Sequence, residues 1–198
     1  YILPVIKDEM LEASHIVHIG SLMLSHDEGI EYTKQLISKS HSMGKLVSFD
    51  INFRTDIFKN IEHAVKVYKE ILELADIVKF SEDEVETFGE EYVNSLKDKL
   101  VCISLGKDGS KYFYNDLTNT LPSIKVKPVD TTGAGDALLA EFSYRYFGLA
   151  SGERKLTEEL MAHAVAAGSA TCTLPGARAP SAAFVDNLAK NLMLKKEQ

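Results

Sequence analysis

Residues 129–136 read Val-Asp-Thr-Thr-Gly-Ala-Gly-Asp, and the apolar run Ala-Leu-Leu-Ala follows directly at residues 137–140. Small residues let a backbone approach a ligand closely, and a helix that begins just after them presents free N–H groups and partial positive charge to an anion. Asp136 ends the loop with a carboxylate, which is suited to accept a proton from a hydroxyl that attacks phosphorus. The stretch therefore predicts phosphoryl transfer to an alcohol, with an ordinary tight strand-to-helix turn as the alternative.

The composition is that of an ordinary folded protein. The chain has 198 residues, of which 45% are hydrophobic and 26% charged, so it has room for one domain with a real core. The formal net charge of −7 argues against nucleic acid or an anionic membrane as a partner. Cys102 and Cys172 lie in apolar surroundings, which predicts buried thiols in a cytoplasmic protein.

Strand-like and helix-like hydrophobic patterns alternate along the chain, which predicts a mostly parallel α/β sheet with helices on both faces. Ser81 and Glu84 have the spacing of a capping box that opens a helix. A hairpin is expected around the turn at 106–109, with further turns at 115–116 and 122–123. We expect one domain over 1–198, with strands at 16–20, 46–50, 77–80 and 100–105, and helices at 28–43, 60–74, 136–147, 157–172 and 182–194.

The Asp-Thr-Thr-Gly-Ala-Gly-Asp motif at 130–136 resembles the nucleotide-end motif of the ribokinase, or phosphofructokinase-B type, carbohydrate kinases. The resemblance covers nearly the whole chain and implies a ribokinase-like three-layer α/β/α sandwich that uses ATP and Mg²⁺. It implies that Asp136 is the catalytic base and also contacts the substrate. It implies as well that the backbone N–H groups of Gly133, Ala134 and Gly135 stabilise the charge that develops during transfer.

Residues 50–54, Asp-Ile-Asn-Phe-Arg, resemble the D-x-N-x-R element of fructokinases and 2-keto-3-deoxygluconate kinases, with Ile51 where Pro is usual. This resemblance implies substrate-side or phosphate-side roles for Asn52 and Arg54. If the segment is extended, the side chains of Asp50, Asn52 and Arg54 point the same way. A capped, solvated turn is the alternative.

Residues 104–109, Ser-Leu-Gly-Lys-Asp-Gly, resemble the T-L-G-x-x-G nucleotide turn of the same family, although an ordinary hairpin turn has a similar pattern. Val165 stands where many relatives have Asn near the adenine, so we expect an apolar wall or backbone contacts to recognise the base. The nucleotide-binding residues implied by the resemblance are Ser104, Gly106, Gly109, Thr132, Gly135 and Gly168.

Two metal roles follow from the resemblance. Glu84 matches the Glu of an N-x-x-E motif that organises hydrated Mg²⁺, with Ser81 in place of Asn, while a helix cap alone is the alternative reading. Asp130 and Thr132 match positions that help to bind a monovalent cation such as K⁺ in relatives. The shifted sequence Ala-Pro-Ser at 179–181 departs from the usual second half of that site.

The resemblance implies ATP-dependent phosphorylation of a primary hydroxyl of a sugar, as in fructokinases. The alternatives are a 2-keto-3-deoxygluconate kinase, a non-catalytic nucleotide-binding fragment, and a regulatory module whose loop binds only phosphate. Relatives carry an additional first third with lid strands and most sugar contacts, and this chain begins with Tyr1 rather than Met. We therefore expect an N-terminally truncated domain without the sugar lid, and the oligomeric state, a homodimer included, stays open.

Overall fold

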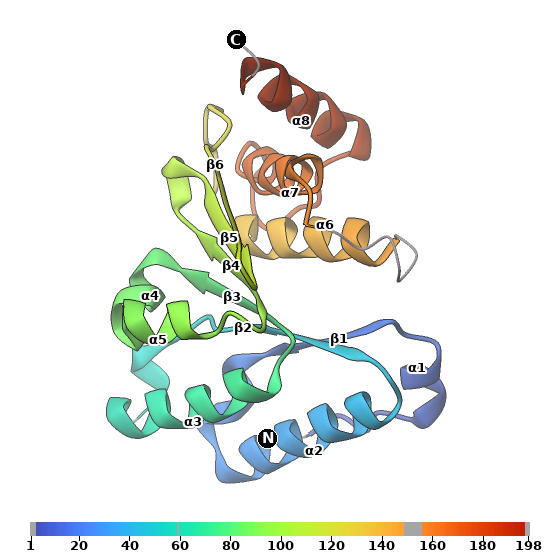
Figure 1. Ribbon diagram of the computed structural model, residues 1–198, viewed down its shortest axis with the longest axis vertical. Coiled ribbons are helices and arrows are strands. Elements are labelled where there is room, and N and C mark those ends of the chain that lie inside the picture. The colour runs from blue at the N-terminus through green and yellow to red at the C-terminus, as the bar shows by residue number, and fades with distance from the viewer. Residues whose placement is uncertain (1–2, 59, 149–155, 197–198) are drawn as a thin grey trace. The chain divides into compact units, whose positions relative to one another are not determined.

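The computed structural model describes residues 3–58, 60–148 and 156–196 (Figure 1). Helices and strands alternate as the sequence predicts. The elements are α1 (Asp8–Glu12), β1 (Ile16–Gly20), η1 (Ser21–Ser25), α2 (Asp27–Ser42), β2 (Leu46–Asp50), η2 (Thr55–Ile57), α3 (Ile61–Leu74), β3 (Ile77–Ser81), α4 (Glu82–Phe88), α5 (Glu90–Ser95), β4 (Leu100–Ser104), η3 (Gly106–Asp108), β5 (Ser110–Tyr114), β6 (Leu117–Leu121), α6 (Ala134–Gly148), α7 (Glu158–Thr171) and α8 (Ala182–Lys196).

The strands pair in the order of the sequence, β1-β2-β3-β4-β5-β6. β1 and β2 are parallel with Val17 opposite Val47, and β2 and β3 are parallel with Phe49 opposite Val78. A helix connects each of these parallel pairs, because parallel neighbours need a crossover connection. The expectation of a mostly parallel α/β sheet is confirmed.

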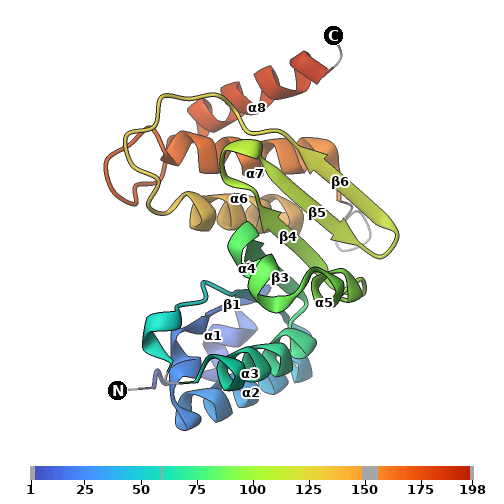
Figure 2. The ribbon, with the colours of Figure 1, turned by 90° about the vertical axis from the view of Figure 1, so that its left-hand side faces the viewer.

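The contacts within the chain group its residues into two compact units. The first unit comprises the residues up to Ile103 together with Phe113–Leu117, and the second comprises Ser104–Tyr112 and the residues from Thr118 onward. In the first unit, α2 and α3 lie side by side, and both follow strands of the parallel sheet (Figure 1, Figure 2). In the second unit, α7 lies between α6 and α8.

The buried face of α3 contributes to the core of the first unit, together with buried residues of β1 to β4 and α2. That face contains Ala64, Val67, Tyr68, Ile71 and Leu72, a stripe at helical spacing. Ile61 and Val65 belong to the same apolar pattern in the sequence, but the Ile61 side chain is exposed. Val65 is only half-buried. Val67 takes their place because it lies one turn from both Ala64 and Ile71.

The second unit is built around α7, which is buried along most of its length. Such a helix is apolar all round, and it packs against α6 on one side and α8 on the other. Gly168 makes the approach of α6 possible. A Cβ atom there would lie 3.0 Å from the Ala134 carbonyl oxygen and 3.4 Å from the Leu138 Cβ atom. The start of α6 is therefore held directly against α7.

The sequence pattern missed one strand. β6 occupies residues 117–121 between the two predicted turns, and residues 122–129 form neither helix nor strand. In β6 only Leu121 is buried, so the strand lacks the apolar alternation by which strands are recognised. Within the described part of the chain, no helix combines the length and the apolar character needed to cross a membrane.

Candidate functional site

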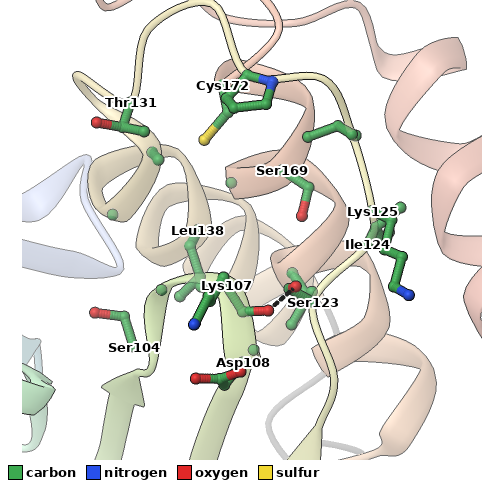
Figure 3. A pocket seen from close by; sticks show the side chains of 18 residues that line it. Ser104, Lys107, Asp108, Ser123, Ile124, Lys125, Thr131, Leu138, Ser169 and Cys172 are labelled. Carbon is green, nitrogen blue, oxygen red and sulfur yellow. Dashed lines mark hydrogen bonds between the residues drawn. The ribbon is translucent and has the colours of Figure 1, made fainter.

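A cavity of about 810 Å³ lies within the second unit (Figure 3). Three segments form its walls: the turn between β4 and β5, the irregular segment after β6, and the facing parts of α6 and α7. The lining residues are Ser104, Gly106, Lys107, Asp108, Gly109, Ser123, Ile124, Lys125, Val126, Pro128, Thr131, Ala134, Gly135, Leu138, Val165, Gly168, Ser169 and Cys172.

The β4–β5 turn is fixed by its own backbone. The Leu105 N–H donates to the Gly109 carbonyl at 2.8 Å, and the Asp108 N–H donates to the Leu105 carbonyl at 3.0 Å. Gly109 has φ +111°, and a Cβ atom there would lie 1.9 Å from the Leu121 carbonyl oxygen. The Ser123 hydroxyl donates to the Lys107 carbonyl, which ties the irregular segment to the turn. The β4–β5 turn and the segment after β6, which form two walls of the cavity, are thus joined by a hydrogen bond.

Asp130 holds the loop before α6. Its Oδ1 accepts the Thr132 N–H at 2.9 Å, and its Oδ2 accepts the Gly176 N–H at 3.0 Å. Hydrogen bonds from the backbone and side chain of Thr132, followed by that from Gly176, lower the pKa of the Asp130 carboxyl. The Val129 N–H also donates to the Cys172 carbonyl at 2.8 Å. The loop that enters α6 is therefore tied to the loop that leaves α7.

The N-terminus of α6 opens at the cavity, where Ala134 and Gly135 line the wall. Ala134 N–H donates to the Thr131 carbonyl and Ala137 N–H to the Gly133 carbonyl. Helix geometry leaves the intervening N–H groups of Gly135 and Asp136 without an intrahelical acceptor. Gly133 has φ +79°, and a Cβ atom there would lie 2.9 Å from the Ala177 Cβ atom. This end of the cavity suits an anion.

The cavity brings together most of the nucleotide-binding residues predicted from the sequence. Ser104, Gly106, Gly109, Gly135 and Gly168 all line it, whereas Thr132 does not and its neighbour Thr131 does. Gly133 shapes the loop, and Asp136 lies exposed in the first turn of α6, outside the lining. The roles of these residues stay predictions.

Sequence reasoning missed the wall formed by residues 123–128 and the contribution of Lys107, Asp108, Ser169 and Cys172. Figure 3 shows Ser169 and Cys172 directed into the same space as Lys107 and Leu138. The expectation that Cys172 is buried is wrong, because it is half-buried on the cavity wall. Partial burial raises the pKa of its thiol. Cys102 is buried as expected. Val165 does present an apolar side chain to the cavity.

The remaining predicted site residues lie in the first unit. Asn52 and Arg54 are exposed on the loop after β2, and Asn52 has φ +35°. The segment is therefore not extended, so the condition under which Asp50, Asn52 and Arg54 were expected to point the same way is not met. Asp50 is buried, and its Oδ1 accepts a hydrogen bond from Lys79 Nζ at 2.9 Å.

The capping box at the start of α4 is confirmed. The Glu84 N–H donates to the Ser81 hydroxyl, and the Ser81 N–H donates to Glu84 Oε2 at 2.7 Å. Within residues 3–58, 60–148 and 156–196, no three His, Cys, Asp or Glu side chains are grouped as metal ligands. Magnesium needs only one or two protein carboxylates. The Mg²⁺ role of Glu84 and the K⁺ role of Asp130 and Thr132 therefore stay predictions.

The sequence of residues 4–183 matches the model of the pfkB family of carbohydrate kinases. The chain belongs to this family. It is 37% identical over 133 residues to a sugar kinase from Pyrococcus horikoshii, an alignment that covers 67% of this chain and 43% of that protein. It is 32% identical over 182 residues to fructokinase-1 of Oryza sativa subsp. japonica, covering 85% of this chain and 56% of that protein. The chain thus spans about half the length of these curated relatives.

Solved structures of a sugar kinase and a fructokinase have the same fold. The crystal structure of the uncharacterized P. horikoshii sugar kinase in complex with ATP has a TM-score of 0.81 and 30% identity, and covers 94% of this chain and 62% of that chain. A fructokinase of Vibrio cholerae O395 with bound fructose, ADP and calcium ion has a TM-score of 0.77 and 26% identity, covering 88% and 60%. The ribokinase-like α/β fold predicted from the sequence is confirmed.

Proposed function

We propose that the chain carries the nucleotide-binding and proton-accepting residues of an ATP-dependent sugar kinase that phosphorylates a primary hydroxyl. Membership of the pfkB family supports the reaction class. The observation that carries the proposal is the cavity that opens onto the N-terminus of α6. The chain spans about half the length of its curated relatives. The natural protein that carries this chain would supply the remaining contacts to the sugar.

The cavity fits a nucleoside triphosphate. Its volume of about 810 Å³ lies within the range of roughly 300–1,000 Å³ typical of small-molecule sites. Leu138 and Val165 offer apolar surface suited to a base, while the glycines of the β4–β5 turn leave room for the backbone to approach a ribose or phosphate. Free N–H groups at the start of α6 suit the phosphates. ATP, when bound there with Mg²⁺, supplies the phosphoryl group.

The residues at the start of α6 have distinct proposed roles. Asp136 accepts the proton of the attacking sugar hydroxyl. Of the three N–H donors predicted from the sequence, that of Ala134 already donates to the Thr131 carbonyl. The N–H group of Gly135, together with that of Asp136, which was not predicted from the sequence, stabilises the negative charge that develops on the transferred group. Because Asp130 ties this loop to Gly176 through its carboxylate, these donors are held in place before any ligand arrives.

Fructose is the leading acceptor, since several relatives carry the name fructokinase and the V. cholerae structure contains fructose. A 2-keto-3-deoxy sugar acid is the alternative. The exposed guanidinium of Arg54 suits the carboxylate of such an acid, because Arg forms paired hydrogen bonds to carboxylates. Competition between the two acceptors in one assay separates these alternatives.

The test is ATP consumption by the natural protein that carries this chain, with Mg²⁺ and each of fructose, 2-keto-3-deoxygluconate, ribose and a nucleoside. Asp136→Asn is the test variant, and Asp116→Asn, an exposed Asp at the β5–β6 turn, is the matched control. We expect turnover on one acceptor, a loss of at least about 10³-fold in Asp136→Asn, and little change in the control.

Nucleotide affinity is measured separately, by calorimetry on the 198-residue chain. ATP binding without turnover in the natural protein would favour the non-catalytic nucleotide module. No nucleotide binding, with retained binding of inorganic phosphate, would favour a regulatory module. Wild-type turnover in Asp136→Asn would refute the assignment of the base.

A further inference from the structure

The loop after β2 contains a residue with a left-handed backbone. Asn52 has φ +35°, a region that glycine adopts freely and that, among the other residues, asparagine tolerates better than most, although it still costs backbone energy. Such residues persist only where the surrounding structure holds them, and they concentrate at functional sites. The Asn52 side chain is exposed, so nothing in its own packing accounts for the conformation. Contacts to the backbone of residues 51–53 hold it instead.

Glu84 makes the shortest of these contacts. Its Oε1 accepts the Phe53 N–H at 2.7 Å, and its Oε2 accepts the Ser81 N–H, also at 2.7 Å. Only 8% of Glu84 is exposed. One carboxylate thus joins the first turn of α4 to the residue that follows Asn52. Charge-assisted hydrogen bonds of this kind are roughly twice as strong as neutral ones.

Two weaker contacts hold the backbone at Asn52 and just before it. The Ser21 hydroxyl donates to the Asn52 carbonyl at 3.3 Å. The Ile51 N–H donates to the Lys79 carbonyl at 3.2 Å. A proline, which is usual at the position of Ile51 in the resembled motif, has no N–H to make the second bond. Backbone contacts therefore fix residues 51, 52 and 53 in succession.

We infer that Glu84 is a positioning residue that holds Asn52 in its left-handed conformation, and that it does not gather a magnesium ion. Both carboxylate oxygens already accept short backbone hydrogen bonds, and little of the side chain faces solvent. A hydrated Mg²⁺ keeps several waters, for which a carboxylate so covered offers little room. The use of the loop in sugar binding rests on the proposed function, whereas the positioning does not.

The test compares Glu84→Gln with Glu86→Gln, an exposed glutamate on the same helix. A glutamine amide has one oxygen and one NH₂ group, so it opposes one of the two backbone donors with another donor. We expect amide hydrogen exchange at Phe53 or Ser81 to become at least about tenfold faster in Glu84→Gln and to stay unchanged in Glu86→Gln. Mg²⁺ affinity, titrated with a non-hydrolysable ATP analogue in the natural protein, should stay within about twofold.

Unchanged exchange at both amides would overturn the inference, and so would a tenfold or greater loss of Mg²⁺ affinity in Glu84→Gln. The exchange measurement needs no turnover, so a failure of the proposed function leaves it interpretable.

If Glu84→Gln does not fold, Asn52→Gly and Asn52→Ala test the left-handed conformation on which the inference rests. Both remove the side chain, but only alanine keeps the strain. We expect the unfolding equilibrium constant of Asn52→Ala to exceed that of Asn52→Gly by roughly five- to thirtyfold. Equal stabilities would show that the loop is not held left-handed.

Discussion

Replacing Gly109 by alanine should disrupt the cavity more than the same change three residues earlier. Gly109 has φ +111° and ψ −130°, a region open essentially to glycine alone. An added Cβ atom would lie 1.9 Å from the Leu121 carbonyl oxygen and 2.7 Å from the Ser123 nitrogen. Gly106 has φ +54°, and a Cβ atom there would meet nothing within 4 Å. The pair therefore separates backbone strain from steric overlap within one turn.

The expected magnitudes follow from these distances. For Gly106→Ala the cost is the left-handed backbone alone, about 1–2 kcal/mol. For Gly109→Ala, backbone strain of about 1–3 kcal/mol is joined by overpacking of about 1–3 kcal/mol. The overlapping atoms belong to the backbone, so a change of rotamer cannot relieve the contact. Gly109→Ala should therefore destabilise by about 3–5 kcal/mol, roughly 2 kcal/mol more than Gly106→Ala.

The assay is urea unfolding of the 198-residue chain followed by far-UV circular dichroism, since the chain has no tryptophan to report by fluorescence. Nucleotide affinity by calorimetry accompanies it, because both glycines line the cavity. Displacement of residues 121–123 should weaken nucleotide binding more in Gly109→Ala than in Gly106→Ala. Equal destabilisation by the two variants would refute the close approach of the turn to the segment after β6.

Two further predictions concern charged groups. The Asp50–Lys79 pair is buried; burial alone would lower the pKa of Lys79, but Asp50 raises it on balance. Asp50→Asn should lower the free energy of unfolding, measured in urea, by about 3–5 kcal/mol. The double variant Asp50→Leu with Lys79→Met should be nearly as stable as the wild type. A double variant less stable than Asp50→Asn would contradict this. Hydrogen bonds from Thr132 and Gly176 lower the pKa of Asp130. Ionised Asp130 therefore stabilises the folded state at pH values above the ordinary carboxyl pKa of about 3.9. That stabilisation is lost as the pH falls through the lowered pKa of the folded state, so Asp130→Asn should flatten the acid side of a Tm-against-pH curve, and an unchanged slope would count against it.

The loop that leads into α6 at one end of the cavity could be predicted from the sequence because the pattern that specifies it is local. Glycines at 133 and 135, a carboxylate at 136 and an apolar run after them specify a loop that enters a helix, whatever surrounds them. The capping box of Ser81 and Glu84 is local in the same sense, and the structure contains it. Strand and helix patterns likewise depend on neighbours within one or two turns.

The other cavity walls and the loop after β2 depend on contacts between residues far apart in the sequence. Ser123 lines the cavity because its hydroxyl donates a hydrogen bond to the Lys107 carbonyl. The two residues are far apart in the sequence, so no local sequence pattern predicts this contact. Alternation predicted a common direction for Asp50 and Asn52, but Asp50 finds a buried partner in Lys79, and the left-handed backbone of Asn52 breaks the alternation. Tertiary contacts decided each of these outcomes, and a single sequence does not display them.

Three carboxylates from the sequence motifs, those of Asp130, Glu84 and Asp136, differ in the contacts that they make. Asp130 and Glu84 each give both oxygens to backbone N–H groups, and each joins two segments in this way. In the part of the chain that the structure describes, the Asp136 carboxylate makes no hydrogen bond or ion pair, and it lies exposed in the first turn of α6. A proton acceptor needs a lone pair that the fold does not already occupy. The unoccupied lone pairs of Asp136 thus agree with its proposed role as proton acceptor, whereas Asp130 and Glu84 each hold a loop in place.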